Sequence, residues 1–106
     1  MIPSVFATSG TIELEDNEFK LYGDGNVITF SVNGEIFDFY NYPKLEIMHD
    51  EQVIQTLDLY PIKNSIFTVI GLDKNFSSGE YIVNLKHKDK ILDSKSFTIF
   101  RDNLVE

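Results

Sequence analysis

The sequence predicts an all-β domain, an immunoglobulin-like β-sandwich of about seven antiparallel strands. Short runs of alternating apolar and polar residues recur about every ten residues, and Gly, Asn, Asp and Pro separate them. Nowhere do apolar residues recur at helical spacing over several turns. Nine Phe, five Tyr and many Ile and Val residues supply the aromatic and β-branched side chains that strands favour.

In each predicted strand the alternation assigns one set of side chains to the core, because successive residues of a strand point to opposite faces. The clearest run is 79–85, in which Tyr81, Val83 and Leu85 share one face. The other expected core residues are Ile12 and Leu14 (run 11–15), Ile28, Phe30 and Val32 (27–32), Leu45 and Ile47 (44–49), Phe97 and Ile99 (95–99), and in the run 65–70 either Phe67 and Val69 or Ile66 and Ile70; a further strand is expected at 52–57.

The length of 106 residues fits one domain with a single core. We expect residues 1–10 to form an N-terminal arm, 11–100 the sandwich and 101–106 a C-terminal linker or tail. The first residues open no secretory signal peptide, and no apolar run approaches the roughly 20 residues of a membrane span. Membrane insertion is therefore not expected.

The formal net charge of -8 disfavours nucleic acid and anionic membranes as partners, because both are bound by clustered Lys and Arg. An acidic surface is better suited to solubility and to the attraction of cations. The chain has no cysteine, which excludes disulfides, thiol nucleophiles and thiolate metal sites.

Catalytic signatures are lacking: there is no G-x-S-x-G, H-E-x-x-H, P-loop or G-x-G-x-x-G sequence. No predicted strand interior supplies a buried carboxylate pair for acid–base work. His49 and His87 end two strands that should be antiparallel neighbours, which places them about 15–20 Å apart. We expect solvated or edge histidines rather than a shared metal site, and we expect no enzyme.

Acidic residues gather in the turns that alternating strands would bring to one end of the sandwich. Carboxylate oxygens suit Ca²⁺, which takes about six to eight oxygen ligands. The sequence therefore predicts a weak Ca²⁺ site at this end, with ordinary solvated loop acids as the alternative, since no D-x-D-x-D-G loop is present. The candidate ligands are Asp16, Glu18, Asp24, Asp50 and Asp73.

Four aromatic residues crowd the segment 36–43 at the opposite end, namely Phe37, Phe39, Tyr40 and Tyr42. Exposed aromatic side chains mark protein interfaces and sugar-stacking surfaces. In the alternative interpretation, Phe37 and Phe39 plug the core while the two tyrosines pack at its rim. Solvent exposure of at least two of the rings would favour the interface.

Two further residues carry specific expectations. Asn75 begins Asn-Phe-Ser, the only N-x-[ST] sequence, and is a possible glycosylation site if the chain is exported. Tyr81 follows Ser-Ser-Gly near the start of its strand, so its ring can be buried while its hydroxyl bonds the turn backbone. That arrangement is a tyrosine corner, a structural role.

Three segments resemble a known family. Residues 16–24 (DNEFKLYGD) and 27–34 (VITFSVNG) resemble the opening D-x-x-x-Y-x-x-G-D-x-V-x-V-x-G of immunoglobulin-like repeats in bacterial and archaeal surface proteins. Residues 78–83 resemble the penultimate G-x-Y-x-V strand of these repeats, and 95–99 their closing x-x-F-x-V. The similarity is to domains of archaeal surface-layer and other envelope proteins.

The resemblance implies a non-catalytic structural or adhesive module, located outside the cell or on its surface, whose partners are neighbouring domains or protein subunits. Two alternatives remain open. The first is a carbohydrate- or peptide-binding module that uses the segment 37–42. The second is a filament subunit completed by a donated strand, for which the apolar segment 2–7 would serve.

Overall fold

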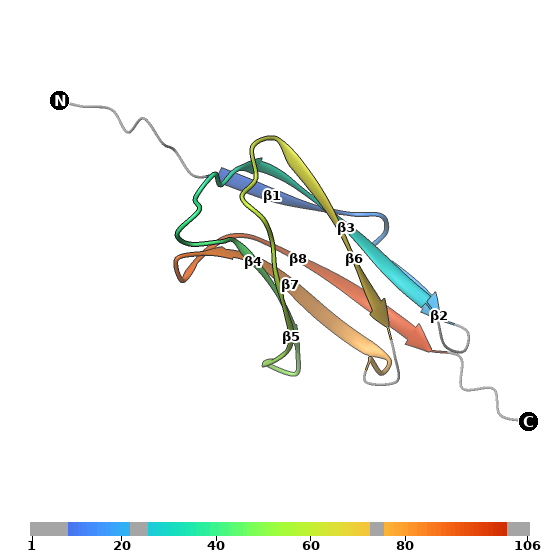
Figure 1. The fold of residues 1–106 in the computed structure, drawn as a ribbon. Coiled ribbons are helices and arrows are strands. Elements are labelled where there is room, and N and C mark those ends of the chain that lie inside the picture. Colours follow the sequence, from blue (N-terminus) through green and yellow to red (C-terminus); the bar gives the residue numbers. More distant parts are fainter. Residues whose placement is uncertain (1–8, 22–25, 73–75, 102–106) are drawn as a thin grey trace, which may run out of the picture.

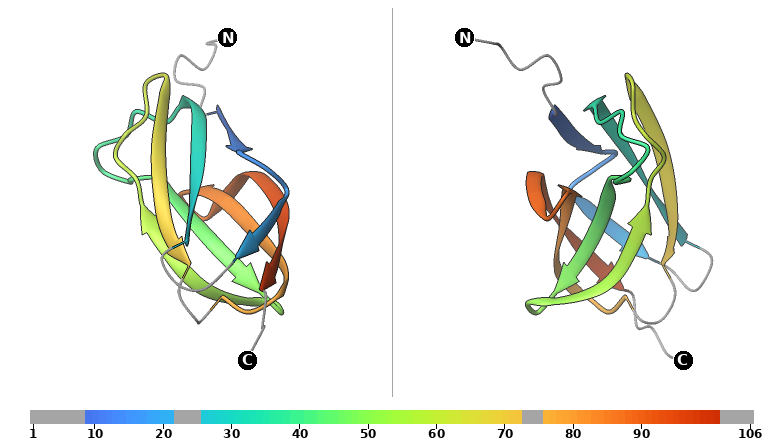
Figure 2. Two further views of the ribbon diagram at one scale, coloured as in Figure 1. Left: turned by 90° about the vertical axis from the view of Figure 1, so that its right-hand side faces the viewer. Right: turned by 60° about the vertical axis from the view of Figure 1, so that its left-hand side comes forward.

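The computed structural model describes residues 9–21, 26–72 and 76–101. These residues form eight β-strands in two sheets packed face to face (Figures 1 and 2), and none of them lies in a helix that could cross a membrane. The prediction of an all-β, immunoglobulin-like β-sandwich is confirmed. The strands are β1 (Ser9–Leu14), β2 (Glu18–Leu21), β3 (Asn26–Glu35), β4 (Lys44–His49), β5 (Gln52–Asp58), β6 (Ser65–Leu72), β7 (Gly79–His87) and β8 (Lys90–Arg101).

One sheet has the order β1-β3-β6 and the other the order β2-β8-β7-β4-β5. All pairs are antiparallel except β2 with β8, which are parallel. The short strand β2 was not among the predicted strands. It exists because the chain leaves the first sheet after β1 and joins the edge of the second, where Asn17 accepts a 2.9 Å hydrogen bond from the backbone N–H of Thr98. The side chain of Asp16 stabilises this crossover by accepting a 2.7 Å bond from the N–H of Asn17.

The core lies between the sheets and contains most of the side chains that alternation assigned to it. In the ambiguous strand β6, Ile70 is buried while Phe67 is 71% exposed, so the core receives the isoleucines. Leu14 is only partly buried against the core. The predicted inward residues that are buried are Ile12, Ile28, Phe30, Val32, Leu45, Ile47, Tyr81, Val83, Leu85, Phe97 and Ile99.

Two tight hairpins shape the larger sheet. Asp50 and Glu51 join β4 to β5, and Lys88 and Asp89 join β7 to β8; all four residues have positive φ, between 52° and 65°. Two left-handed residues give the turn whose twist matches that of the flanking strands. The second hairpin starts β8 at Lys90, earlier than the predicted start at residue 95.

The core is closed at one end by Ile36, Leu59 and Ile62. Ile36 and Ile62 exchange two backbone hydrogen bonds of 2.8 and 2.9 Å, and the N–H of Leu59 donates to Pro43. These contacts leave the aromatic segment 37–42 outside the core.

The sandwich extends slightly beyond the expected range of 11–100. Ser9 already pairs with Glu35, and Arg101 is the last residue of β8. The Arg101 guanidinium donates a 2.6 Å hydrogen bond to the carbonyl oxygen of Phe76, and its backbone N–H donates to Ser78 Oγ at 2.8 Å. Arg101 therefore belongs to the fold, although the sequence assigned it to the tail.

Gly34 allows the close approach of β1 to β3. Its φ is +149°, and a Cβ atom there would lie 2.2 Å from the carbonyl oxygen of Ser9 and 2.6 Å from the Cα of Gly10. We expect Gly34→Ala to lower the free energy of unfolding by about 1–3 kcal/mol, because both clashes are with backbone. Urea denaturation measures this. Gly71→Ala is the matched control, since its Cβ would meet nothing within 4 Å; equal effects of the two variants would contradict the packing described.

Candidate functional site

The residues predicted to bind Ca²⁺ do not come together in the described part of the chain. Glu18 lies opposite Thr98, Thr98 lies opposite Glu80, and Asp50 follows β4, one strand further on. Three strand spacings separate Glu18 from Asp50, about 14 Å. Glu18 is thus level with Asp50 along the strands but lies across the sheet from it, because β2 is an edge strand and two strands stand between β2 and β4.

Two other candidate ligands, Asp24 and Asp73, and the candidate glycosylation site Asn75 lie outside the described residues. Within the described ranges, no three His, Asp or Glu side chains are grouped so that they could hold a metal ion. The weak Ca²⁺ site therefore stays a prediction, because Asp24 and Asp73 belong to its candidate ligands.

Tyr81 is fully buried, and its hydroxyl donates a 2.7 Å hydrogen bond to the carbonyl oxygen of Ser77. Burial raises the pKa of the Tyr81 phenol above its ordinary value. Its ring stacks on His49 at 4.2 Å and on Phe97 at 5.5 Å between centroids. Nδ1 of His49 lies 3.0 Å from the carbonyl oxygen of Glu80, and since a carbonyl only accepts, Nδ1 carries the proton. These contacts give both side chains a structural role.

The five exposed aromatic rings at the other end of the sandwich form a surface that we call the aromatic end: Phe37, Phe39, Tyr40, Tyr42 and Tyr60. Tyr40 is 96% exposed, and even the most covered ring, Tyr42, is 41% exposed. None of the rings plugs the core, because the isoleucines and leucine described above close it. The aromatic segment is thus available as an interface or ligand surface.

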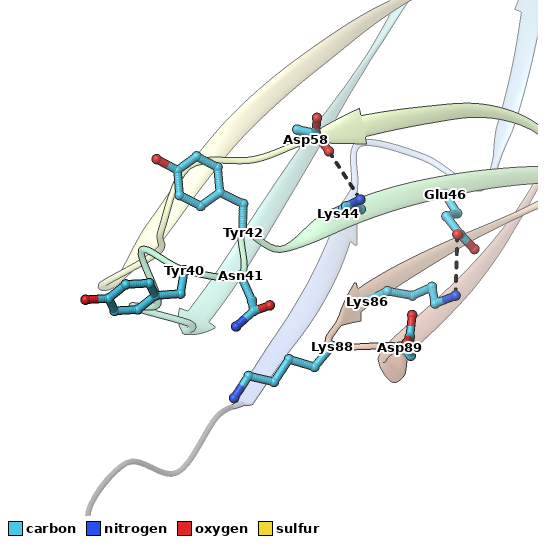
Figure 3. A pocket seen from close by; sticks show the side chains of 9 residues that line it. All are labelled: Tyr40, Asn41, Tyr42, Lys44, Glu46, Asp58, Lys86, Lys88 and Asp89. Atoms are coloured by element: carbon cyan, nitrogen blue, oxygen red, sulfur yellow. Dashed lines mark hydrogen bonds and ion pairs between the residues drawn. The ribbon is translucent and has the colours of Figure 1, made fainter.

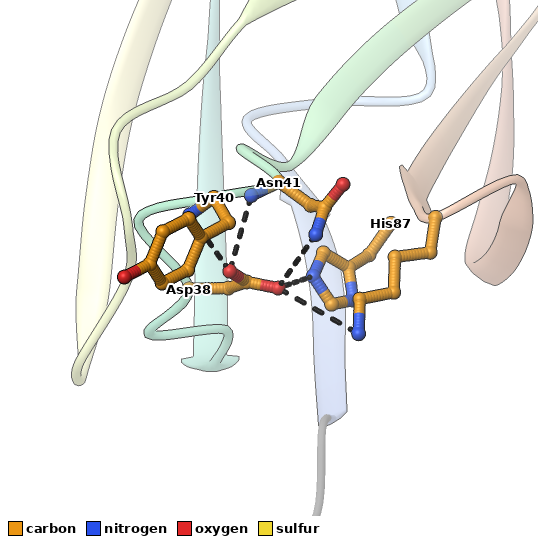
Figure 4. A network of polar contacts seen from close by, with 5 residues as sticks. Asp38, Tyr40, Asn41 and His87 are labelled. Carbon is orange, nitrogen blue, oxygen red and sulfur yellow. Dashed lines mark hydrogen bonds and ion pairs between the residues drawn. The ribbon is translucent and has the colours of Figure 1, made fainter.

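The loop between β3 and β4, which carries four of these rings, is anchored by Asp38 (Figure 4). Oδ1 of Asp38 accepts hydrogen bonds from the backbone N–H groups of Tyr40 (2.9 Å) and Asn41 (3.1 Å), and Oδ2 accepts one from Nε2 of His87 (3.0 Å). The hydrogen bond from Tyr40, with those from His87 and Asn41, lowers the pKa of Asp38 to about 2 against opposing desolvation. The Lys88 ammonium lies 3.9 Å from Oδ2. The loop is therefore tied to the β7–β8 hairpin.

The other four aromatic side chains of the aromatic end contact one another in pairs. Phe37 and Phe39 meet edge to face with centroids 4.9 Å apart, and Tyr42 and Tyr60 lie 6.3 Å apart. The ammonium of Lys63 is 5.7 Å from the centre of the Phe37 ring. Such contacts reduce the ordering that binding would otherwise require.

Beside the aromatic end lies a cleft of about 490 Å³ (Figure 3). Its volume falls in the range of small-molecule sites, about 300–1,000 Å³. The loop forms one side, and the outward side chains of β4 and β7 form the other. Two ion pairs between neighbouring strands belong to its lining, Lys86–Glu46 at 3.4 Å and Lys44–Asp58 at 3.9 Å. The lining residues are Tyr40, Asn41, Tyr42, Lys44, Glu46, Asp58, Lys86, Lys88 and Asp89.

The antiparallel register of β4 and β7 places His49 and His87 at opposite ends of the sheet, as the sequence predicted. Of the expected solvated or edge histidines, His87 is not solvated: it ends β7, is 7% exposed and is bonded to Asp38. The sequence also missed Tyr60 and the cleft lysines, because their association depends on contacts between distant segments. The only local signal was the density of aromatic residues around Asp38.

Fold and site together define an immunoglobulin-like sandwich whose polar and aromatic groups face outward at one end. No protein-family model matches the sequence, and no curated protein sequence matches it. Among solved structures, the chain is similar to the CARDB domain of a Pyrococcus furiosus protein, crystallised in complex with di-metal ions. The identity is 7% and the TM-score 0.53, over 91% of this chain and 94% of that one.

Two further structures are similar to a smaller degree. A solution NMR structure of the same CARDB domain has 8% identity and a TM-score of 0.48, and the match covers 88% of this chain and 94% of that one. A β-glucosidase from Listeria innocua in complex with glucose also has 8% identity and a TM-score of 0.48, with 88% of this chain and 16% of the enzyme covered. At these identities the similarity concerns the fold alone.

We expect Tyr81→Phe to lower the free energy of unfolding by about 1 kcal/mol, because it removes the hydroxyl bonded to the Ser77 carbonyl. Thermal or urea denaturation measures this loss. Tyr40→Phe removes a hydroxyl from a 96% exposed side chain and should change stability by less than about 0.5 kcal/mol. A Tyr81→Phe variant as stable as Tyr40→Phe would show that the buried bond contributes nothing.

The depressed pKa of Asp38 predicts a pH dependence of stability. Ionised Asp38 is favoured in the folded state, whose pKa of about 2 lies below the ordinary 3.8. Its contribution is therefore complete above about pH 4 and disappears as the pH falls towards 2. Urea denaturation across this range should show the wild type losing its advantage over Asp38→Asn. Glu13→Gln, an exposed change on β1, serves as the control; an advantage independent of pH would contradict the prediction.

Proposed function

We propose that this chain is a non-catalytic module of a cell-surface protein and that it makes adhesive contacts through its aromatic end. The observation that carries the proposal is the exposure of five aromatic rings on an anchored loop and its neighbour. Monomeric proteins rarely expose large contiguous apolar patches, and Tyr and Phe are enriched at interfaces. A surface of this kind is expected to be covered when the protein works.

The path of the chain supports a spacer role. β1 begins beside Glu35 at the aromatic end, and β8 ends beside Leu21 at the opposite end (Figure 1). A sandwich that the chain enters at one end and leaves at the other can be joined in series with similar domains. The location outside the cell, and the relation to surface-layer or envelope proteins, rest on the sequence resemblance.

The proposed partners are neighbouring domains or protein subunits. A domain joined ahead of β1 would lie next to the aromatic end, while a separate subunit could reach the same rings from solvent. The net charge of -8 continues to argue against nucleic acid and anionic membranes. Strand donation by the segment 2–7 stays a prediction, since that segment lies outside the described residues.

The titratable groups support a non-catalytic role. Among the described residues, Asp38 and Tyr81 have clearly shifted pKa values. Both shifts follow from contacts that hold the fold: Asp38 anchors a loop, and Tyr81 is buried under His49 and Phe97. Catalytic groups with shifted pKa values typically face a cleft beside a nucleophile or a substrate.

Retention on cell envelopes of the source organism tests the adhesive role. The triple variant Phe37→Ser, Phe39→Ser, Tyr40→Ser should lose at least about tenfold in retention, since interface aromatics dominate binding energy. Phe67→Ser with Val69→Ser is the control, because these two exposed residues lie on the outer face of the other sheet. Equal retention of the two variants would contradict the adhesive role. The cell-surface location is tested separately by adding protease to intact cells: protection of the native protein from cleavage would contradict it.

A further inference from the structure

We infer that the cleft beside the aromatic end binds a neutral oligosaccharide; this inference rests on the proposed binding role of that end and names its ligand. The cleft combines an aromatic rim with a charged floor (Figure 3). Tyr40 and Tyr42 lie on the loop side, and Lys44, Glu46 and Lys86 project from the outer face of the larger sheet. A pyranose ring has apolar C–H faces and a rim of hydroxyl groups. Binding it therefore requires both an aromatic surface for the C–H face and polar groups for the hydroxyls.

The rim presents a flat apolar surface. The ring of Tyr40 is 96% exposed, yet its backbone is held by the Asp38 carboxylate. The negatively charged face of an aromatic ring attracts the C–H groups of a sugar, which are weakly positive. Tyrosine supplies this surface at a low entropic cost, because only two side-chain torsions are fixed.

The floor offers hydrogen-bond donors beside acceptors. In the Lys86–Glu46 pair the ammonium and carboxylate lie 3.4 Å apart, and the two side chains are 27% and 20% exposed. Two adjacent sugar hydroxyls can bind such a pair together: one accepts from the ammonium and the other donates to the carboxylate. Hydrogen bonds to charged groups are about twice as strong as those between neutral groups. The Lys44–Asp58 pair, 3.9 Å apart, repeats the arrangement.

The balance of charge selects a neutral ligand. Six of the nine lining residues are charged, three lysines and three acids, so the formal charges cancel although the whole chain carries -8. An anionic saccharide would meet the acids and the overall negative charge, and a cationic ligand would meet the lysines. An apolar ligand would desolvate charged groups without replacing their hydrogen bonds. A neutral molecule rich in hydroxyl groups avoids all three costs.

Isotope-edited NMR titration of the chain tests the inference. The probes are hexasaccharides of β1,4-linked glucose, mannose and N-acetylglucosamine, with oligogalacturonate as the anionic comparator. At least one neutral probe should shift the amide signals of residues 40–44 and 86–89. Tyr40→Ala and Lys86→Met should each weaken that binding at least about tenfold. Tyr40→Phe should retain it, because the stacking face is kept.

Phe67→Ala is the matched control, since this ring is 71% exposed on the other sheet; it should bind the probe as the wild type does. Failure of every neutral probe, tighter binding of oligogalacturonate, or signals that shift away from the cleft would each overturn the inference. If the probes fail while envelope retention still depends on the aromatic end, the sugar is wrong and the adhesive role stands. If both fail, the proposed function falls as well.

Discussion

The structure depends on the burial of two apolar faces against each other. Ile28, Phe30 and Val32 of β3 are fully buried, as are Val83 and Leu85 of β7 in the opposite sheet. The chain has no cysteine, so hydrophobic burial and hydrogen bonding must stabilise the domain without a covalent link between the sheets. The loops at both ends can differ in chemistry because this core fixes their positions.

The sequence predicted the features that follow from the alternation of apolar and polar residues. It did not predict the features that depend on contacts between distant segments of the chain. Alternation identified the buried face of β7, since its side chains change sides at each residue. It could not choose the face of β6, because both sets are apolar and a shift of one residue exchanges them. The turn at Lys88 and Asp89 was missed because neither residue is the glycine or asparagine that marks left-handed turns. β2 is short and pairs with residues far along the chain, so no local sequence pattern predicts it.

The candidate site shows the same division. The aromatic loop was visible in the sequence as a cluster, but the sequence could not decide between exposed rings and a core plug; in the structure Ile36 is buried and Phe37 is exposed. His87 and Asp38 meet only when β7 and the loop have reached their positions in the sandwich. The cleft draws on the loop, β4, β5 and the β7–β8 hairpin, which are up to about fifty residues apart in the chain.

The opposite placement of the first and last strands has a mechanical consequence. Tension applied to the two ends of the sandwich would run nearly parallel to β1 and β8. It would load the β1–β3 ladder and the β2–β8 ladder in shear, so that the hydrogen bonds across each pair would bear force together rather than one after another. The Arg101 anchor would lie directly in the line of pull. A domain connected in this way would resist extension by force applied at its two ends.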